Sequence, residues 1–230
     1  MTIGKYIFVR KLNNISNLSR REREKEQRRE DILNSATALF FEKPYDNVSM
    51  DDIAQELELS KATLYLYFKN KHSLFFAVVI KGMNILNKIL QEAKTKATTG
   101  LQQILSMTEA LYSYMSSHGA YYKLNLASRS PRFQLLSQQG EIENMAEYIN
   151  LTQLLFGIIE DSIKLGIEDG TIRPDIEPTK ATMFLGTAIE SSVLVPPEYE
   201  ILLQMRGFTK REYFAHSINL LLQGISSKKS

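Results

Sequence analysis

Residues 48–71, VSMDDIAQELELSKATLYLYFKNK, constrain the fold of this chain more than any other stretch. They predict two short helices joined by a tight turn, the first beginning after Ser49 and the second after Ser60. Each serine precedes an apolar-periodic run, as an N-cap does, and Asp52 stands three residues after Ser49 in a variant of the capping box. The pattern is typical of a helix-turn-helix motif.

The period of the apolar residues predicts which side of each helix is buried. The expected inner face consists of Ile53, Ala54, Leu57, Leu64 and Phe68. At about 100° per residue, the opposite side of the second helix carries Ala62, Leu66 and Lys69. An outward leucine is unusual on an ordinary protein surface but suits contact with thymine methyl groups. The second helix therefore has the character of a DNA reader.

Helical spacing continues on both sides of the motif. Ahead of it, the capping pair Ser19 and Glu22 opens a helix that ends by Pro44. After it, Asn70 is the expected N-cap of a long helix from Lys71. Further helices are predicted near residues 101–117, 119–128, 141–168, 177–194 and 209–224. No strand alternation persists, so the predicted fold class is all-α.

We expect three parts in the chain: a flexible basic arm over residues 1–18, a three-helix DNA-binding domain over residues 19–72 and a larger helical domain over residues 73–230. Residues 1–30 contain nine Lys and Arg against four Asp and Glu. This surplus suits contact with phosphates, although a solvated tail has the same composition.

Composition argues against several other classes of protein. The chain has no cysteine, which excludes disulfides and thiolate metal sites. The longest uninterrupted apolar run, residues 74–80, is far shorter than the roughly 20 residues of a membrane-spanning helix. The apolar segment near the N-terminus is too short for a signal peptide. We therefore expect a soluble, cytoplasmic protein.

The motif residues resemble the N-terminal signature of TetR-family transcriptional regulators. The likeness is carried by Ile53, Ala54, the run from Ser60 to Phe68, Lys71 and Leu74. It implies an N-terminal helix-turn-helix domain followed by a larger C-terminal helical domain for ligand binding and dimerisation. One departure lies in the turn, where the family usually has glycine and this chain has Glu58. A left-handed backbone there would cost a residue with a Cβ about 1 kcal/mol.

The resemblance implies that the second helix of the motif enters the major groove. The residues expected at DNA are Ser49, Ser60, Lys61, Ala62, Thr63, Tyr65, Leu66, Tyr67, Lys69 and Lys71. Among them Lys61, Ala62 and Leu66 face base edges, where a lysine donates to guanine and apolar groups meet thymine methyls. Phosphates are held by Thr63, Tyr65, Tyr67 and Lys71. For the two tyrosines the alternative is packing against Phe68.

An apolar effector cavity among the C-terminal helices is also implied. Its candidate lining residues are Tyr112, Met115, His118, Tyr122, Tyr148, Phe156, Met183 and Phe184. Adaptable Met and aromatic side chains suit a flat or greasy effector. Their helical spacing is equally typical of an ordinary core.

Small and apolar residues near the C-terminus predict a two-fold, four-helix dimer interface. Its candidate residues are Gly186, Ala188, Ser191, Ser192, Tyr213, Phe214, Ser217, Leu220 and Leu221. A protein that reads a two-fold operator needs such a surface. The alternative is ordinary packing within one chain.

These features predict a homodimeric, ligand-responsive repressor that binds a palindromic operator in double-stranded DNA and is released by a small apolar or aromatic effector. No cofactor, metal or membrane is expected. A helical metal or cofactor enzyme is the main alternative, but His72, His118 and His216 are scattered and no HExxH, P-loop or GxGxxG motif is present. A helical adaptor without DNA binding would leave the run from Thr63 to Phe68 unexplained.

Overall fold

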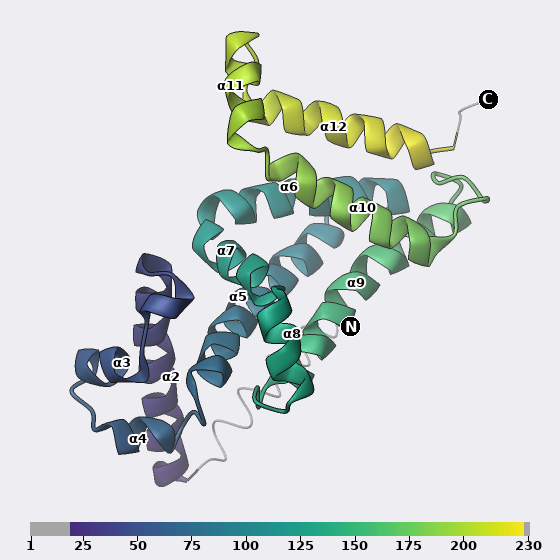
Figure 1. Ribbon diagram of the computed structural model, residues 1–230. Helices are drawn as coiled ribbons and strands as arrows, with labels where there is room; N and C mark the ends of the chain where they lie inside the picture. The colour runs from purple at the N-terminus through teal and green to yellow at the C-terminus, as the bar shows by residue number, and fades with distance from the viewer. Residues whose placement is uncertain (1–18, 228–230) are drawn as a thin grey trace. The chain divides into compact units, whose positions relative to one another are not determined.

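The computed structural model describes residues 19–227, and these residues form helices without any strand (Figure 1). The α-helices are α2 (Arg20–Glu42), α3 (Met50–Glu56), α4 (Lys61–Tyr65), α5 (Lys71–Lys94), α6 (Gly100–Ser117), α7 (Gly119–Ser128), α8 (Pro131–Gln138), α9 (Met145–Glu168), α10 (Pro178–Val193), α11 (Pro197–Met205) and α12 (Lys210–Ile225). A 3-10 turn, η1 (Tyr45–Asn47), joins α2 to α3. The all-α prediction is confirmed.

The described residues divide into two compact units. Unit 1 contains residues 19–84 together with Ala120–Ile149, and unit 2 contains Ile85–Gly119 with residues 150–227. The predicted domain boundary after residue 72 does not coincide with this division, because the start of α5 and all of α8 belong to unit 1. The predicted arm, residues 1–18, lies outside the described residues.

Unit 1 is built on α2. The helix begins at a capping box in which the Ser19 amide donates to the Glu22 carboxylate at 2.7 Å, as the sequence predicted. It ends before Pro44, because the residue ahead of a proline disfavours helical backbone. Ile32 and Phe40 on its inner side are at most 3% exposed, and α3 packs against α2 and α4 against α3.

Helix α5 supplies much of the core. Its Asn70 cap is confirmed, since the side-chain oxygen accepts the Ser73 amide proton at 2.8 Å. Residues 73–80 are all buried. By length and a mean hydropathy of 1.5 this helix matches a membrane span, but 61% of that window is buried inside the protein. Its apolar residues are therefore those of a core helix.

The packing of unit 2 includes a close crossing of α6 and α9. A Cβ built on Gly100 would lie 2.1 Å from the Gly166 nitrogen and 2.2 Å from the Ser162 carbonyl oxygen. The Gly100 amide donates to the Asp169 carboxylate at 2.7 Å, which caps the start of α6. Around this crossing α6, α9, α10 and α12 bury one core, which includes Ile104, Met107, Ile163, Leu185, Phe214 and Ile218.

Most predicted helices are confirmed, and two were missed. Those near 101–117, 119–128, 177–194 and 209–224 agree with α6, α7, α10 and α12 within one residue at each end. The helix predicted from residue 141 begins at Met145 instead. Helices α8 and α11 were missed because Pro131 and Pro197 were interpreted as breaks, whereas each is the first helical residue, where proline is well tolerated.

The α6–α9 crossing generates a stability prediction. Gly100→Ala should lower the free energy of unfolding by about 2–3 kcal/mol, because backbone cannot yield to the added methyl group. Gly157→Ala is the matched control, since a Cβ on Gly157 in α9 meets nothing within 4 Å. The control should be neutral or stabilising by up to about 1 kcal/mol. Urea denaturation measures both, and equal midpoints would contradict the crossing.

Candidate nucleic-acid interface

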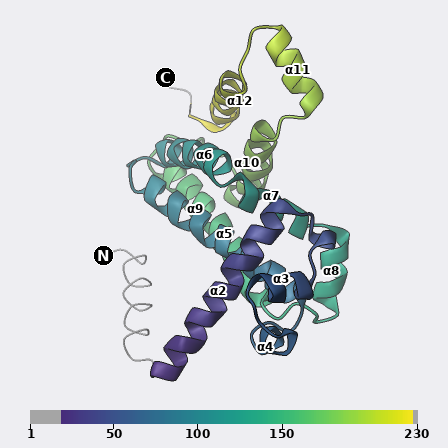
Figure 2. The same ribbon diagram turned by 90° about the vertical axis from the view of Figure 1, so that its left-hand side faces the viewer.

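Two short helices joined by a tight turn form the core of the candidate interface (Figure 2). The Ser49 hydroxyl accepts the Asp52 amide proton at 3.1 Å, and the Asp52 carboxylate accepts the Ser49 amide proton at 2.7 Å. The Ser49 hydroxyl also donates to the Asp52 carboxylate at 2.7 Å, and this bond, together with the one from the Ser49 amide, lowers the pKa of Asp52. Ser60 caps α4 by accepting the Thr63 amide proton at 3.1 Å. Both predicted helix starts are confirmed.

The turn is a Schellman motif with a non-glycine residue in its left-handed position. Leu59 donates its amide proton to the Ala54 carbonyl at 2.9 Å, and Glu58 donates to Gln55 at 3.1 Å. Glu58 has φ +53°, and it is the one non-glycine residue with positive φ among residues 19–227. The left-handed backbone considered from the sequence is therefore present, and the turn keeps its geometry without glycine.

Helix α4 has a buried face and an exposed face, as predicted. Leu64 and Phe68 are 0% and 3% exposed, whereas Leu66 is 78% exposed. Lys61 and Ala62 are also exposed. Tyr65 is 44% exposed, and Thr63 and Tyr67 are half-buried at the edges of the same face. The two tyrosines are thus not simply packed into the core.

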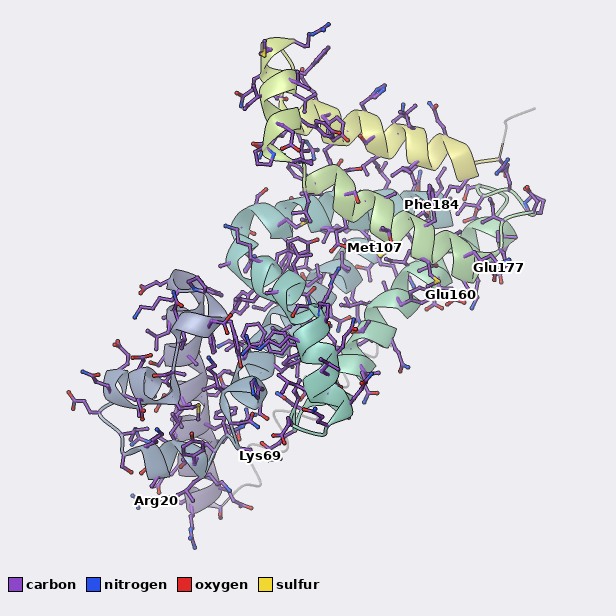
Figure 3. The ribbon with its side chains drawn as sticks, viewed as in Figure 1. Arg20, Lys69, Met107, Glu160, Glu177 and Phe184 are labelled. Atoms are coloured by element: carbon purple, nitrogen blue, oxygen red, sulfur yellow. The ribbon has the colours of Figure 1, made fainter. Side chains whose placement is uncertain are left out.

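The exposed face contains an ion pair. The Lys61 ammonium lies 2.8 Å from the Asp51 carboxylate in the first turn of α3, and this hydrogen bond raises the pKa of Lys61. Both side chains are more than half exposed, so water screens the pair and its contribution to stability is small. Lys61 can exchange Asp51 for a base edge or a phosphate at that small cost. Lys69, labelled in Figure 3, is exposed at the end of the motif.

Lys71 differs from its predicted role. Its ammonium donates to the Tyr45 carbonyl at 3.0 Å and to the Val48 carbonyl at 2.8 Å, and it lies 4.1 Å from the centre of the Tyr45 ring. Burial lowers its pKa. Two of its three N–H groups therefore hold the connection between α2 and α3. A phosphate contact through the third remains a prediction.

The candidate effector residues are divided between the two units. Tyr122 and Tyr148 belong to unit 1, and the other six belong to unit 2. Within unit 2, Tyr112 packs 4.5 Å from Phe214, and His118 stacks on Tyr114. The prediction is wrong for Met183 and Phe184, which are 63% and 61% exposed on α10. Their apolar character suggested an interior position, whereas both side chains are exposed.

The candidate dimer residues are also divided between inside and outside. Phe214 is 0% exposed in the core of unit 2, and the Ser192 hydroxyl donates to the Ala188 carbonyl of its own helix. Ser191, Tyr213 and Leu220 are exposed, while the others are half-buried. Phe214 and Ser192 are therefore intramolecular residues rather than interface residues.

Apart from Leu105 and Leu154, the exposed large apolar residues of unit 2 lie on or between α10, α11 and α12. They are Met183, Phe184, Leu194, Tyr199, Ile201, Leu202, Met205, Phe208, Tyr213 and Leu220, and we call them the apolar surface. Part of this surface is a groove of about 360 Å³ lined by Val195, Tyr199, Leu202, Leu203, Arg206, Phe208 and Tyr213. The contribution of α11 was not predicted from the sequence, although residues 199–205 contain five apolar residues in seven, as an apolar helix does.

Comparison with known proteins agrees with this geometry. Residues 32–78 match the family model described as bacterial regulatory proteins, tetR family. The biofilm operon icaADBC HTH-type negative transcriptional regulator IcaR of Staphylococcus aureus (strain Newman) is 32% identical over 84 residues, which are 36% of this chain and 41% of that protein. The HTH-type transcriptional activator FasR of Mycolicibacterium smegmatis is 27% identical over 100 residues, 44% of this chain and 46% of FasR.

Solved structures resemble the chain over most of its length. The ketosteroid transcriptional regulator KstR2 of Mycobacterium tuberculosis has a TM-score of 0.60 at 18% identity, covering 87% of this chain and 96% of that one. The fatty acid degradation regulator FadR of Bacillus halodurans has a TM-score of 0.64 at 15% identity, covering 85% and 95%. At these identities the likeness establishes the fold alone. The sequence relatives, in turn, are matched over less than half of their length.

The Schellman turn generates a prediction about Glu58. Glu58→Gly should raise the free energy of unfolding by up to about 1 kcal/mol, because glycine adopts positive φ without a Cβ clash. Glu56→Gly removes the same charge two residues earlier, at the helical end of α3, and should lower it by up to about 1 kcal/mol. Thermal unfolding compares the two. A loss of stability in Glu58→Gly would contradict the observed turn.

Proposed function

We propose that this chain is a regulator of the TetR family, a homodimeric repressor whose helix α4 reads the major groove of a palindromic operator. The observation that carries the proposal is the exposed face of α4 and its C-cap, where Leu66 is 78% exposed on the side opposite the buried Leu64. An isolated exposed leucine on so short a helix serves no packing role in the protomer. Lys61 supplies a hydrogen-bond donor, and Ala62 and Leu66 supply contacts for thymine methyl groups.

Repression, rather than activation, is favoured by the sequence relatives. IcaR is named a negative transcriptional regulator, and it is the more identical of the two relatives described above. FasR is named an activator, so the sign of regulation is part of the proposal. These relatives are regulators and not enzymes, which leaves the enzyme alternative without support. A cytoplasmic location is part of the same proposal, since that is where an operator would be bound.

A small apolar or aromatic effector is proposed to act through unit 2. Support comes from Tyr112, Met115, His118 and Phe156, which are half-buried side chains of that unit, and Tyr112 packs against its core. The names of KstR2 and FadR point to steroid and fatty-acid chemistry in proteins of this fold. Such an effector releases DNA only if it binds the non-binding conformation more tightly.

The base-reading proposal is tested by mobility shift with duplex DNA from upstream of the protein's own gene. Lys61→Ala should change base preference, because it removes a donor whose specific contact is worth about 1–3 kcal/mol. Lys69→Ala is the charge-matched control and should weaken all sequences alike while reducing the salt slope by about 1. If neither substitution alters binding, α4 is not at the DNA.

The apolar surface is proposed to bury itself in a two-fold dimer. Ten exposed large apolar side chains on three consecutive helices would form an apolar patch of a size that marks an interaction site. Phe184 on α10 is labelled in Figure 3. The small residues Gly186 and Ala188 on the same helix permit close approach of a second copy.

Analytical ultracentrifugation tests the dimer. The wild-type protein should sediment with a mass near twice 26.3 kDa. Phe184→Glu places a charge within the apolar surface and should yield monomers, because an unpaired buried charge is costly. Leu105→Glu, at an exposed leucine of α6 outside that surface, should remain dimeric. A wild-type monomer at micromolar concentration would refute the interface.

A further inference from the structure

Within unit 1, helix α8 packs against η1 and the start of α5, the two segments that flank the helix-turn-helix motif. Its Phe133 is 4% exposed and stacks on Phe75 of α5, with ring centroids 5.0 Å apart and an interplanar angle of 7°. The same ring meets Tyr45 edge-on at 5.0 Å and Phe76 at 5.4 Å. One side chain of α8 thus joins η1, which precedes α3, to α5, which follows α4.

Arg132 adds a polar contact at the same place. Its guanidinium pairs with the Asp46 carboxylate in η1 and lies 5.0 Å from the centre of the Tyr45 ring. The hydrogen bond from Arg132 holds the pKa of Asp46 below its usual value. Both charged groups are at least half exposed, so the ion pair is a weak contact compared with the burial of Phe133.

The connection from α8 to α9 holds the other end of the motif. The Asn70 amide group donates to the Glu141 carbonyl at 2.8 Å. The Glu143 amide donates to the Ser73 hydroxyl at 3.1 Å, and the Asn144 side chain donates to the Ser73 carbonyl at 3.2 Å. Asn70 and Ser73 form the first turn of α5, so these bonds fix the point where the chain leaves α4.

Tyr45 connects these contacts to each other. Its hydroxyl group shares a hydrogen bond with His72 Nδ1, and its carbonyl accepts from Lys71. Its ring packs edge-on against Phe75 at 4.9 Å. Burial raises the pKa of this tyrosine to about 12, so the hydroxyl remains protonated in the physiological range. Displacing α8 would therefore loosen η1 and the start of α5 together.

We propose that Phe133 and Arg132 of α8 are positioning residues. They determine the orientation of the reading helix α4 without touching DNA. Residues 131–144 hold the chain both before α3 and after α4, and the five-residue α4 is too short to fix its own direction. The angle at which α4 enters the major groove then depends on α8. This inference rests on the proposed DNA-binding function.

The test compares specific with non-specific DNA binding. The wild-type protein first selects a duplex from a random library, and each variant is then titrated with that duplex and with a scrambled one. Phe133→Leu should weaken binding to the selected duplex by about 3- to 10-fold, and Arg132→Ala by about 2- to 5-fold, with little change on the scrambled duplex. A purely structural role would lower the melting temperature without changing this specificity ratio in folded protein.

Two matched controls come from the same unit. Leu135→Ala shortens an apolar side chain of α8 that is 59% exposed, and Lys123→Ala removes a positive charge from an exposed position on α7. Both should keep the wild-type specificity ratio. Equal ratios in Phe133→Leu, Arg132→Ala and the controls would overturn the proposal.

Hydrogen exchange gives a second readout that needs no DNA. Amides of residues 61–74 should exchange faster in Phe133→Leu than in Leu135→Ala, while those of residues 32–40 in α2 should be unchanged. Unchanged exchange over residues 61–74 would also overturn the proposal. If the wild-type protein selects no sequence, the proposed function fails, and exchange alone then decides whether α8 holds α4.

Discussion

The burial of Leu64 and Phe68 is the interaction on which the candidate interface depends. A helix of five residues has little stability of its own, because nucleation is costly and few hydrogen bonds repay it. Helix α4 exists because these two side chains enter the core of unit 1 and Ser60 caps its start. With the inner face fixed, helical geometry directs Ala62 and Leu66 outward. The surface proposed to read DNA is therefore exposed because the opposite side of α4 is packed into the core.

That core continues beyond the motif. Phe75, at the start of α5, is in contact with Phe40 of α2, Tyr45 of η1 and Phe133 of α8. Aromatic pairs of this kind add about 0.5–1.5 kcal/mol beyond their buried area. Unit 1 therefore behaves as one packed body in which residues far apart in sequence share the support of α4. In such a structure, a substitution at a residue that does not touch DNA can change how α4 contacts it.

Much of the motif was predictable from sequence, because its signals are local. The caps at Ser49 and Ser60 and the inner pair Leu64 and Phe68 all depend on residues within one or two helical turns. Longer-range contacts were not predictable. Nothing in the sequence around Lys71 reveals that its ammonium binds the carbonyls of Tyr45 and Val48, since carbonyls are common to all residues.

Helical period also cannot decide which side of a helix meets which partner. Tyr213 and Phe214 are adjacent apolar residues, yet one is exposed and the other is fully buried against Tyr112. Met183 and Phe184 were assigned to an interior for the same reason. The choice depends on how α10 and α12 pack on α6, which is a property of tertiary structure.

Thymine-to-uracil scanning of a selected operator tests the central claim most directly, because each replacement removes only one methyl group from the major groove. If Ala62 and Leu66 read bases, at least one replacement in each half-site should weaken binding to the wild-type protein. Sensitivity at the thymine that Leu66 contacts should disappear when Leu66 is replaced by alanine. Binding that is indifferent to every replacement, or a pattern unchanged in Leu66→Ala, would contradict the account.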